Sequence, residues 1–435
     1  MRTFPTDITC RRATFTGDIG GCPTIARIST SLDLHSREFL EDPAPTLRWL
    51  REHEPVHRSP YGYWLLTRYD DIATAFRDPR LSSEWTKKGS LPGVSARHGG
   101  VPDLEDPFVR AQQVVLHSFN MKDAPSHTRI RRLVQQAFSR AAVDDQRQRV
   151  TGLVDEMVDR ALASGSIDVV TDLAFPLTIT IASEMIGIPV EARDRFRASF
   201  EDTERLGDPT ATEEQRAAAR RALVWQLDFI GHEVTARRRE PRADLVTALV
   251  QAEEHGDTLT HDEILAALLT LYTAAGTTTE RMISSGMLLL LQHPDQLALL
   301  RTRPELIGGA ITEILRYHHP NQQTTTPRLA LEPREMRGIT IGAGSTVRFA
   351  LGAANRDPER WAEPELFDIT RPELVSLSFG QGIHYCIGAP LARMQATIAI
   401  DRMLVRCPAL TLAGDVRHDP RRMDRYERVL VDVRG

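Results

Sequence analysis

One long run of apolar residues with helical spacing constrains the fold of this chain more than any other feature. It follows Thr260, and Glu263 three residues later completes the capping-box pattern of a helix N-terminus. The pattern continues to His293-Pro294, so the predicted helix has about 33 residues and a length of roughly 50 Å. Because the run is apolar almost throughout, we expect this helix to cross the molecule and to be buried on most sides.

Helical periodicity also dominates the sequence around this helix. Apolar residues recur at steps of three and four in residues 130–138, 148–163, 173–186, 213–239 and 244–254. A last helix is predicted over residues 389–406, and short strand-like segments occur at residues 63–67 and 428–433. Residues 85–126 contain scattered Gly, Pro and charged residues, which predicts a long functional loop. The predicted fold is mainly α with small β sheets, and residues 1–32 are expected to form an irregular leader.

Composition and charge exclude several classes of function. The chain has 435 residues, with 54 Lys and Arg against 59 Asp and Glu, and the net charge of -5 gives no overall attraction to nucleic acid or to an acidic membrane. The N-terminus lacks the apolar core of a signal peptide, and no stretch of about 18 apolar residues occurs. Four cysteines match neither a zinc site nor a disulfide framework: Cys10, Cys22, Cys386 and Cys407. We therefore expect a soluble, cytoplasmic protein that binds neither nucleic acid nor membrane.

The segment around Cys386 carries the strongest chemical signal. Residues 379–390 read FGQGIHYCIGAP, in which two glycines allow a tight loop close to a flat ligand. Cys386 stands just before a predicted helix, whose first N–H groups would point at its sulfur and favour a thiolate. A buried structural cysteine is the usual interpretation of a lone cysteine, and it fits Cys407.

With its fixed residues Phe379, Gly380 and Gly388, this segment resembles the haem-binding signature of the cytochrome P450 family. The resemblance implies that Cys386 binds the iron of haem b, which is iron protoporphyrin IX. It also implies a cytochrome P450 fold over residues 33–435, a single large helical catalytic domain with the long central helix over the haem.

Two further motifs support the resemblance. Glu313 and Arg316 match the family's E-x-x-R, in which one helical turn places a carboxylate beside a guanidinium. Alone, such a pair would be an ordinary surface ion pair, but together with Arg371 it resembles the buried Glu-Arg-Arg cluster that stabilises the family's core. Residues 354–358, which read ANRDP, are similar to a segment of bacterial members.

Cationic residues from separate segments match the family's contacts to the haem propionates. They are His127, Arg131, Arg328 and His384. Basic residues on a helix usually form a solvated face, but several cations from different segments suit two carboxylates. One departure is visible, because Ser376 stands where the family's H-L-x-F-G segment has its His.

The central helix contains Ala275 and Gly276 followed by three threonines, which aligns with the family's A-G-x-D/E-T-T. In that pattern the glycine opens the helix towards dioxygen, the acid supplies protons and Thr279 orders water. The acid position is Thr278 here, and Glu280 lies two residues further on and faces another direction. For Thr277 we expect a hydrogen bond to a preceding carbonyl.

The resemblance implies a monooxygenase that oxidises a small organic molecule by hydroxylation or epoxidation. Electrons would come from ferredoxin and ferredoxin reductase, docked on the Cys386 side near three arginines: Arg129, Arg132 and Arg393. The missing acid leaves oxidative coupling, desaturation or peroxide-driven chemistry open. A haem sensor and a non-haem helical binding protein are weaker alternatives.

A polar segment follows the E-x-x-R helix and predicts an oxygenated substrate, such as an intermediate of secondary metabolism. The candidate substrate residues are Gln323, Thr324, Thr325 and, on a late strand, Tyr426. Polar side chains facing a dry pocket need partners, which favours a ligand with hydroxyl, amide or sugar groups. The alternative is that these side chains bond to loop backbone.

Overall fold

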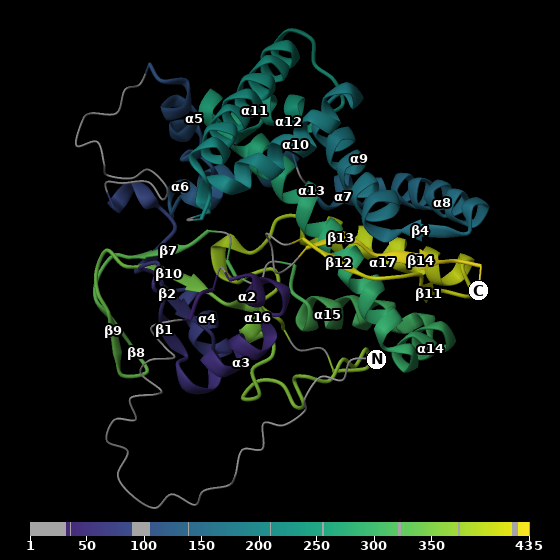
Figure 1. Ribbon diagram of the computed structural model, residues 1–435. Coiled ribbons are helices and arrows are strands. Elements are labelled where there is room, and N and C mark those ends of the chain that lie inside the picture. Colours follow the sequence, from purple (N-terminus) through teal and green to yellow (C-terminus); the bar gives the residue numbers. More distant parts are fainter. Residues whose placement is uncertain are drawn as a thin grey trace, which may run out of the picture.

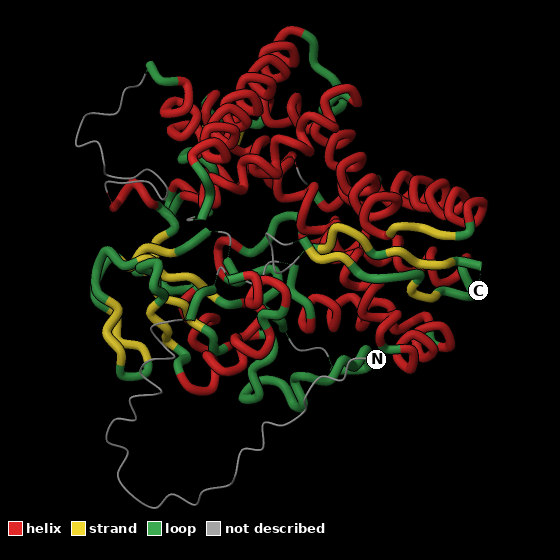
Figure 2. The backbone as a smooth tube through the Cα atoms, viewed as in Figure 1, coloured by secondary structure: helices red, strands yellow, loops and turns green. Residues whose placement is uncertain are grey.

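The computed structural model describes residues 32–88, 105–419 and 425–434, apart from residues 35, 138, 209, 255, 321–322, 325 and 373–374. The predicted leader therefore lies outside the described residues, except for Leu32. Helices form most of the described chain, and short strands gather in small sheets (Figure 2). This confirms the predicted fold class.

Helix α13, His261–Gln292, passes through the middle of the molecule (Figure 1). The Thr260 hydroxyl accepts the N–H of Glu263, whose side chain accepts the N–H of Thr260, so the predicted capping box is present. Its residues from Thr279 to Leu290 are buried. A Cβ at Gly286 would lie 3.0 Å from the side chains of Ile314 and Ile400, so the glycine allows close helix packing here.

The other predicted helices are confirmed. They are α6 (Ser126–Ala137), α8 (Gln146–Ser164), α9 (Phe175–Ile186), α11 (Glu213–Arg239), α12 (Leu245–Gln251) and α17 (Ala389–Arg406). Three more helices are α10 (Arg193–Thr203), α14 (Pro294–Thr302) and α15 (Ile307–Tyr317).

Two local predictions were wrong. Residues 85–126 are not only a loop, because α5 forms over Pro107–Val115, where Asp106 caps the helix and Pro107 occupies its first turn. The helix predicted over 244–254 ends at Gln251, and Glu253–Glu254 pair as strand β5 with Asp257–Thr258. In the first place a cap starts a helix within the predicted loop, and in the second the turn between β5 and β6 (Asp257–Thr258) ends the helix before its periodic pattern does.

The largest sheet lies on one side of the helical part (Figure 1). Its strands are, in spatial order, β1 (Val56–Arg58), β2 (Trp64–Leu66), β10 (Thr346–Phe349), β7 (Arg328–Ala330) and β3 (Leu81–Ser82). The predicted strand at 63–67 is therefore confirmed as β2. The predicted strand at 428–433 is divided between β13 (Tyr426–Arg428) and β14 (Leu430–Asp432).

One helical stretch of the described residues, Val169–Ile186, is long and apolar enough to cross a membrane by length and composition. In this structure 61% of it is buried, where it packs against α13 and α8 in the main core. It is thus a core helix here.

Candidate active site

The loop that carries Cys386 is shaped by two glycines. Gly380 and Gly382 have φ values of +70° and +72°, which L side chains rarely adopt. A Cβ on Gly382 would also lie 3.0 Å from the Phe76 carbonyl oxygen, so the loop approaches its neighbour closely. The Cys386 N–H donates to the Phe379 carbonyl at 2.9 Å, which closes the loop just before α17.

The Cys386 side chain is accessible, yet protein atoms surround it closely. Burial raises the pKa of its thiol, while the N–H groups of Gly388 and Ala389 and the charge of Arg131 oppose this effect. The N–H groups at the helix N-terminus thus favour a thiolate, as expected, although desolvation is the larger effect in the protein alone. A coordinated metal ion deprotonates a thiol outright, so the thiolate form depends on the cofactor.

A group of four basic residues lies near this loop: His127 and Arg131 on α6, Arg328 on β7, and His384. His127 is 1% exposed, and neither ring nitrogen has a hydrogen-bond partner among the described residues. Its ring centroid lies 4.2 Å from that of His384, whose Nε2 atom is 3.1 Å from the Ser83 hydroxyl. Arg328 is 5% exposed, and burial lowers its pKa to about 10.

The charges of this group show which ligand would fit it. Burial, together with Arg131 and Arg328, lowers the pKa of His127 to about 4, and burial lowers that of His384 to about 3. The nearby carboxylate of Asp123 is held elsewhere, by the Ser83 N–H at 2.9 Å and by Ser82 and Lys87. In the protein alone burial therefore favours neutral imidazoles, and Arg131 and Arg328 supply the positive charge. Carboxylates next to these arginines would favour the charged imidazoles as well, so the group fits a ligand with carboxylates, as haem with its two propionates is.

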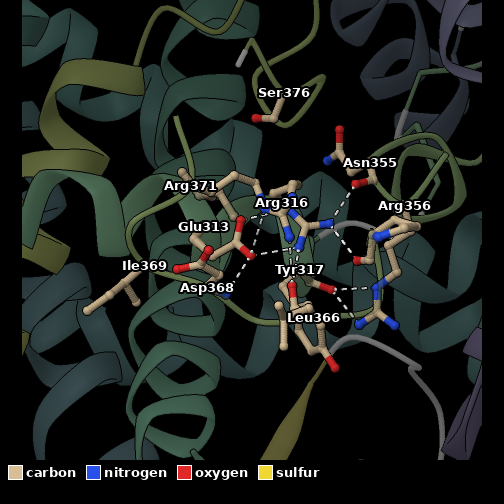
Figure 3. A network of polar contacts seen from close by, with 12 residues as sticks. Glu313, Arg316, Tyr317, Asn355, Arg356, Leu366, Asp368, Ile369, Arg371 and Ser376 are labelled. Carbon is tan, nitrogen blue, oxygen red and sulfur yellow. Dashed lines mark hydrogen bonds and ion pairs between the residues drawn. The ribbon is translucent and has the colours of Figure 1, made fainter. Parts of the chain in front are cut away.

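The structure also brings Glu313, Arg316 and Arg371 together (Figure 3). The Glu313 carboxylate accepts two hydrogen bonds from Arg316, at 2.6 and 2.7 Å, and lies 3.4 Å from Arg371. The remaining guanidinium donors bind main-chain carbonyls, including that of Leu366 for both arginines. Glu313 and Arg316 are buried, so this is no surface ion pair.

Ser376, the departure from the family pattern, donates to the Ser378 hydroxyl at 3.0 Å. Asn355 binds the same hydroxyl at 3.0 Å and belongs to the network around Arg316 in Figure 3. The sequence prediction missed the role of the Asn355 side chain, although its segment had been singled out. It also missed Asp123, for which a lone Asp in a loop gives no signal.

In α13, Thr277 donates to the Thr273 carbonyl at 3.3 Å, as predicted. Thr278 does the same with Ala274 at 2.9 Å. Thr279 and Gly276 are buried, and a Cβ on Gly276 would make only ordinary contacts, 3.4 Å from Ile179 and 3.6 Å from Phe200. Packing against these neighbours therefore does not explain this glycine.

Glu280, whose carboxylate was predicted to face away from the acid position 278, is buried. It accepts the Ser284 hydroxyl at 3.4 Å, and its charge acts on Arg425, next to strand β13. Ala275, beside Gly276, is half-buried and packs against the core around α10 and α11. The helix thus offers threonine hydroxyls at the predicted site, with its acid directed towards Arg425.

The candidate substrate residues behave differently from one another. The Thr324 hydroxyl accepts the Phe349 N–H at 3.2 Å, which favours the alternative of bonding to loop backbone. Gln323 is half-buried, and Thr325 lies outside the described residues. Tyr426 is buried between the rings of His318 and His418, at 5.8 and 4.7 Å, and burial raises its pKa to about 12.

The predicted docking arginines are also not equivalent. Arg129 forms ion pairs with the buried Glu263 and with Asp257, so much of its charge is neutralised. Arg393 donates to Thr312 at 3.1 Å and lies over the Phe379 ring. Arg132 is exposed.

A family model described as Cytochrome P450 matches residues 112–423. The chain is 38% identical over 383 residues to Cytochrome P450 monooxygenase PikC of Streptomyces venezuelae, with 86% of each chain covered. It is also 38% identical over 399 residues to 6-deoxyerythronolide B hydroxylase of Saccharopolyspora erythraea, which covers 89% of this chain and 94% of that protein.

Solved structures show the same fold. P450BioI, in complex with an acyl carrier protein that carries hexadec-9Z-enoic acid, has a TM-score of 0.82 and 32% identity over 91% of this chain and 99% of that chain. The polyketide synthase cytochrome P450 PksS of Bacillus subtilis also has a TM-score of 0.82, with 31% identity over 93% of this chain and 100% of that chain.

Proposed function

This chain belongs to the cytochrome P450 family of haem-thiolate enzymes, and we propose that it hydroxylates or epoxidises an oxygenated small molecule of secondary metabolism. The observation that carries this proposal is the group of buried His127 and Arg328 with half-buried Arg131 and His384, beside the accessible Cys386 sulfur. These basic residues would hold the two carboxylates of the cofactor, and the Cys386 sulfur would be the ligand of its iron. When bound, haem supplies the activation of dioxygen by two electrons and two protons.

The protein's own residues then have separate tasks. Cys386 would hold the iron through its sulfur, and the N–H groups of Gly388 and Ala389 would temper the negative charge on that sulfur. The propionates would be held and neutralised by His127, Arg131, Arg328 and His384. The buried ion pairs around Glu313 hold the chain beneath Cys386 in place.

On α13, Thr279 would order water near the bound dioxygen, and Thr278 occupies the position of the acid. A hydroxyl can relay a proton but cannot act as an acid near neutral pH. We infer that a hydroxyl group of the substrate completes the proton path. Two relatives support an oxygenated substrate by their names. They are 6-deoxyerythronolide B hydroxylase and the polyketide biosynthesis cytochrome P450 PksS.

A cytoplasmic ferredoxin, reduced by its reductase, is the proposed electron donor. Arg132 and Arg393 are the proposed docking residues, and Arg129 contributes less because it is engaged with two carboxylates. The second candidate function is oxidative coupling. It is favoured by Thr278 in the acid position and by 32% identity, at a TM-score of 0.79, to CxnD, an enzyme for C–S bond formation in chuangxinmycin biosynthesis.

The proposal is tested first by spectroscopy of the purified haem-loaded protein. The ferrous carbon monoxide complex should show the strongly red-shifted band of thiolate ligation, and Cys386→His should lose it. Retention of the band in the variant would overturn the assignment. Titration with polyketide, terpenoid, peptide and aromatic compounds, followed at the Soret band, then identifies the substrate class.

A further inference from the structure

A buried imidazole holds the carbonyl group of Ser378, just before the loop that carries Cys386. His319 is 2% exposed, and its Nε2 atom lies 2.9 Å from the Ser378 carbonyl oxygen. A carbonyl oxygen only accepts hydrogen bonds, so Nε2 must carry the proton. This contact therefore sets the tautomer of the ring and restrains the peptide group that joins Ser378 to Phe379.

The Ser378 hydroxyl is held as well. It donates to the Leu315 carbonyl at 2.9 Å and accepts a hydrogen bond from the Asn355 side-chain amide at 3.0 Å. The Asn355 side-chain oxygen accepts the Leu377 N–H at 2.8 Å, and its main-chain carbonyl binds Arg316 at 3.0 Å. The segment before the loop is thus fixed both to α15 and to the Glu-Arg-Arg cluster drawn in Figure 3.

The restrained peptide is continuous with the Cys386 backbone. The next carbonyl along the chain, that of Phe379, accepts the Cys386 N–H at 2.9 Å. The Phe379 ring lies 6.3 Å from the Tyr385 ring and 5.1 Å beneath the Arg393 guanidinium. A rotation of the 378–379 peptide would therefore displace the group that holds Cys386 in its loop.

We propose that His319 is a positioning residue for thiolate ligation: its Nε2–H donor keeps Ser378 and Phe379 in the orientation that presents the Cys386 sulfur to the iron. This inference rests on the proposed function, because it requires Cys386 to be the iron ligand. His319 acts through the backbone, by way of its contact with the Ser378 carbonyl. Its hydrogen bond, and not merely its volume, is what the loop requires.

Gln and Met at position 319 separate these two properties, because they have similar length and only Gln keeps an N–H donor. The matched control is His318→Leu, which removes the neighbouring imidazole that stacks on Tyr426 at 5.8 Å. For each haem-loaded protein we would measure how fast the red-shifted ferrous carbon monoxide band is lost on mild warming, together with Tm by circular dichroism.

We expect H319M to lose the band about 3- to 10-fold faster than the native protein, as one lost buried hydrogen bond predicts. H319Q should stay within about twofold of the native rate, and H318L should match the native protein. Equal rates for H319Q and H319M, or a loss that only follows Tm, would overturn the inference.

Two further outcomes are distinguishable. If the native protein itself lacks the red-shifted band, the proposed function fails, whatever His319 does. If H319M does not fold with haem, Ser378→Ala weakens the same segment from its hydroxyl side. Accelerated band loss in S378A would then support the inference, and a native rate would overturn it.

Discussion

The rings of His127 and His384 lie 4.2 Å apart between their centroids, at an interplanar angle of 57°. Arg131 and Arg328 act on both rings, and the structure holds them close together in a buried space. Groups of like charge disfavour each other's charged forms, and burial disfavours all of them. The arrangement is therefore unfavourable for the protein alone and favourable with two carboxylates.

This relationship predicts a pH dependence that differs between the apoprotein and the haem-loaded protein. Burial, mainly, lowers the pKa of His127 to about 4 and that of His384 to about 3. In the unfolded chain both groups bind protons near their unperturbed pKa of about 6.5, so the unfolded state binds more protons below that pH. The free energy of unfolding of the apoprotein should therefore fall as the pH decreases from about 6.5 towards 4.

Propionates would raise both pKa values, so the same decrease should be shallower in the haem-loaded protein. Tm measured at several pH values between about 7.5 and 5 checks this for both forms. His127→Asn should flatten the apoprotein curve, since it removes one of the two groups. Parallel curves for the two forms would argue against propionates in this space.

Arg328 offers a more local test of the same site. Arg328→Gln removes a buried cation that would bind a propionate, and such a charged hydrogen bond contributes about 1.5–3 kcal/mol. Haem transfer to an acceptor protein should become about 10- to 100-fold faster. Arg348→Gln is the matched control, because Arg348 lies on the neighbouring strand β10 with its guanidinium over the Tyr63 ring. An equal effect of both substitutions would show a general loss of stability instead.

The Glu313 cluster should contribute to stability rather than to ligand selection. Glu313→Gln leaves the buried Arg316 without its carboxylate, and breaking a buried pair in this way costs about 3–5 kcal/mol. The free energy of unfolding in denaturant measures the loss. Glu305→Gln breaks the exposed Arg303–Glu305 pair, where side chains are 54% and 63% exposed, and should leave the free energy of unfolding almost unchanged, because solvent screens such pairs. A small loss of unfolding free energy in Glu313→Gln would mean that the attraction within these ion pairs barely exceeds the cost of desolvating their charges.

The sequence alone predicted the helical framework well, because helices are encoded by short-range patterns. The capping box at Thr260 and Glu263 and the periodicity of 389–406 specify their elements without tertiary contacts. The resemblance likewise predicted residues that the structure brings together, as with Glu313 and Arg371.

What escaped prediction depends on contacts between distant segments. The helical pattern predicts that the Arg129 side chain faces solvent, but in the structure it forms an ion pair with Glu263, 134 positions further along the chain. The pKa of Cys386 is set by burial, which the helix N-terminus does not reveal. The hydroxyl of Thr324 is used by the Phe349 backbone, and no local pattern indicates that pairing. These are properties of packing, so they appear only in three dimensions.

The proton path gives the most informative prediction about chemistry. Thr278 donates to the Ala274 carbonyl at 2.9 Å and has no acidic proton to give. Glu280 is buried and acts on Arg425, so it does not replace the acid at position 278. If the substrate supplies the missing hydroxyl, a large fraction of the reducing equivalents should already appear as product in the native protein.

The fraction of reducing equivalents recovered as product should be compared among the native protein, Thr278→Glu and Thr279→Ala with the true substrate. The comparison decides between proton delivery by the substrate and a proton path that simply lacks its acid. Thr278→Glu should then raise the product fraction little, because the substrate already completes the path. Thr279→Ala should lower it several-fold and release peroxide, because the water that Thr279 orders is disturbed. Low native coupling that Thr278→Glu restores would show instead that the acid was merely missing. A substrate analogue lacking its hydroxyl provides the complementary test, since it should uncouple the native protein and leave Thr278→Glu comparatively unaffected.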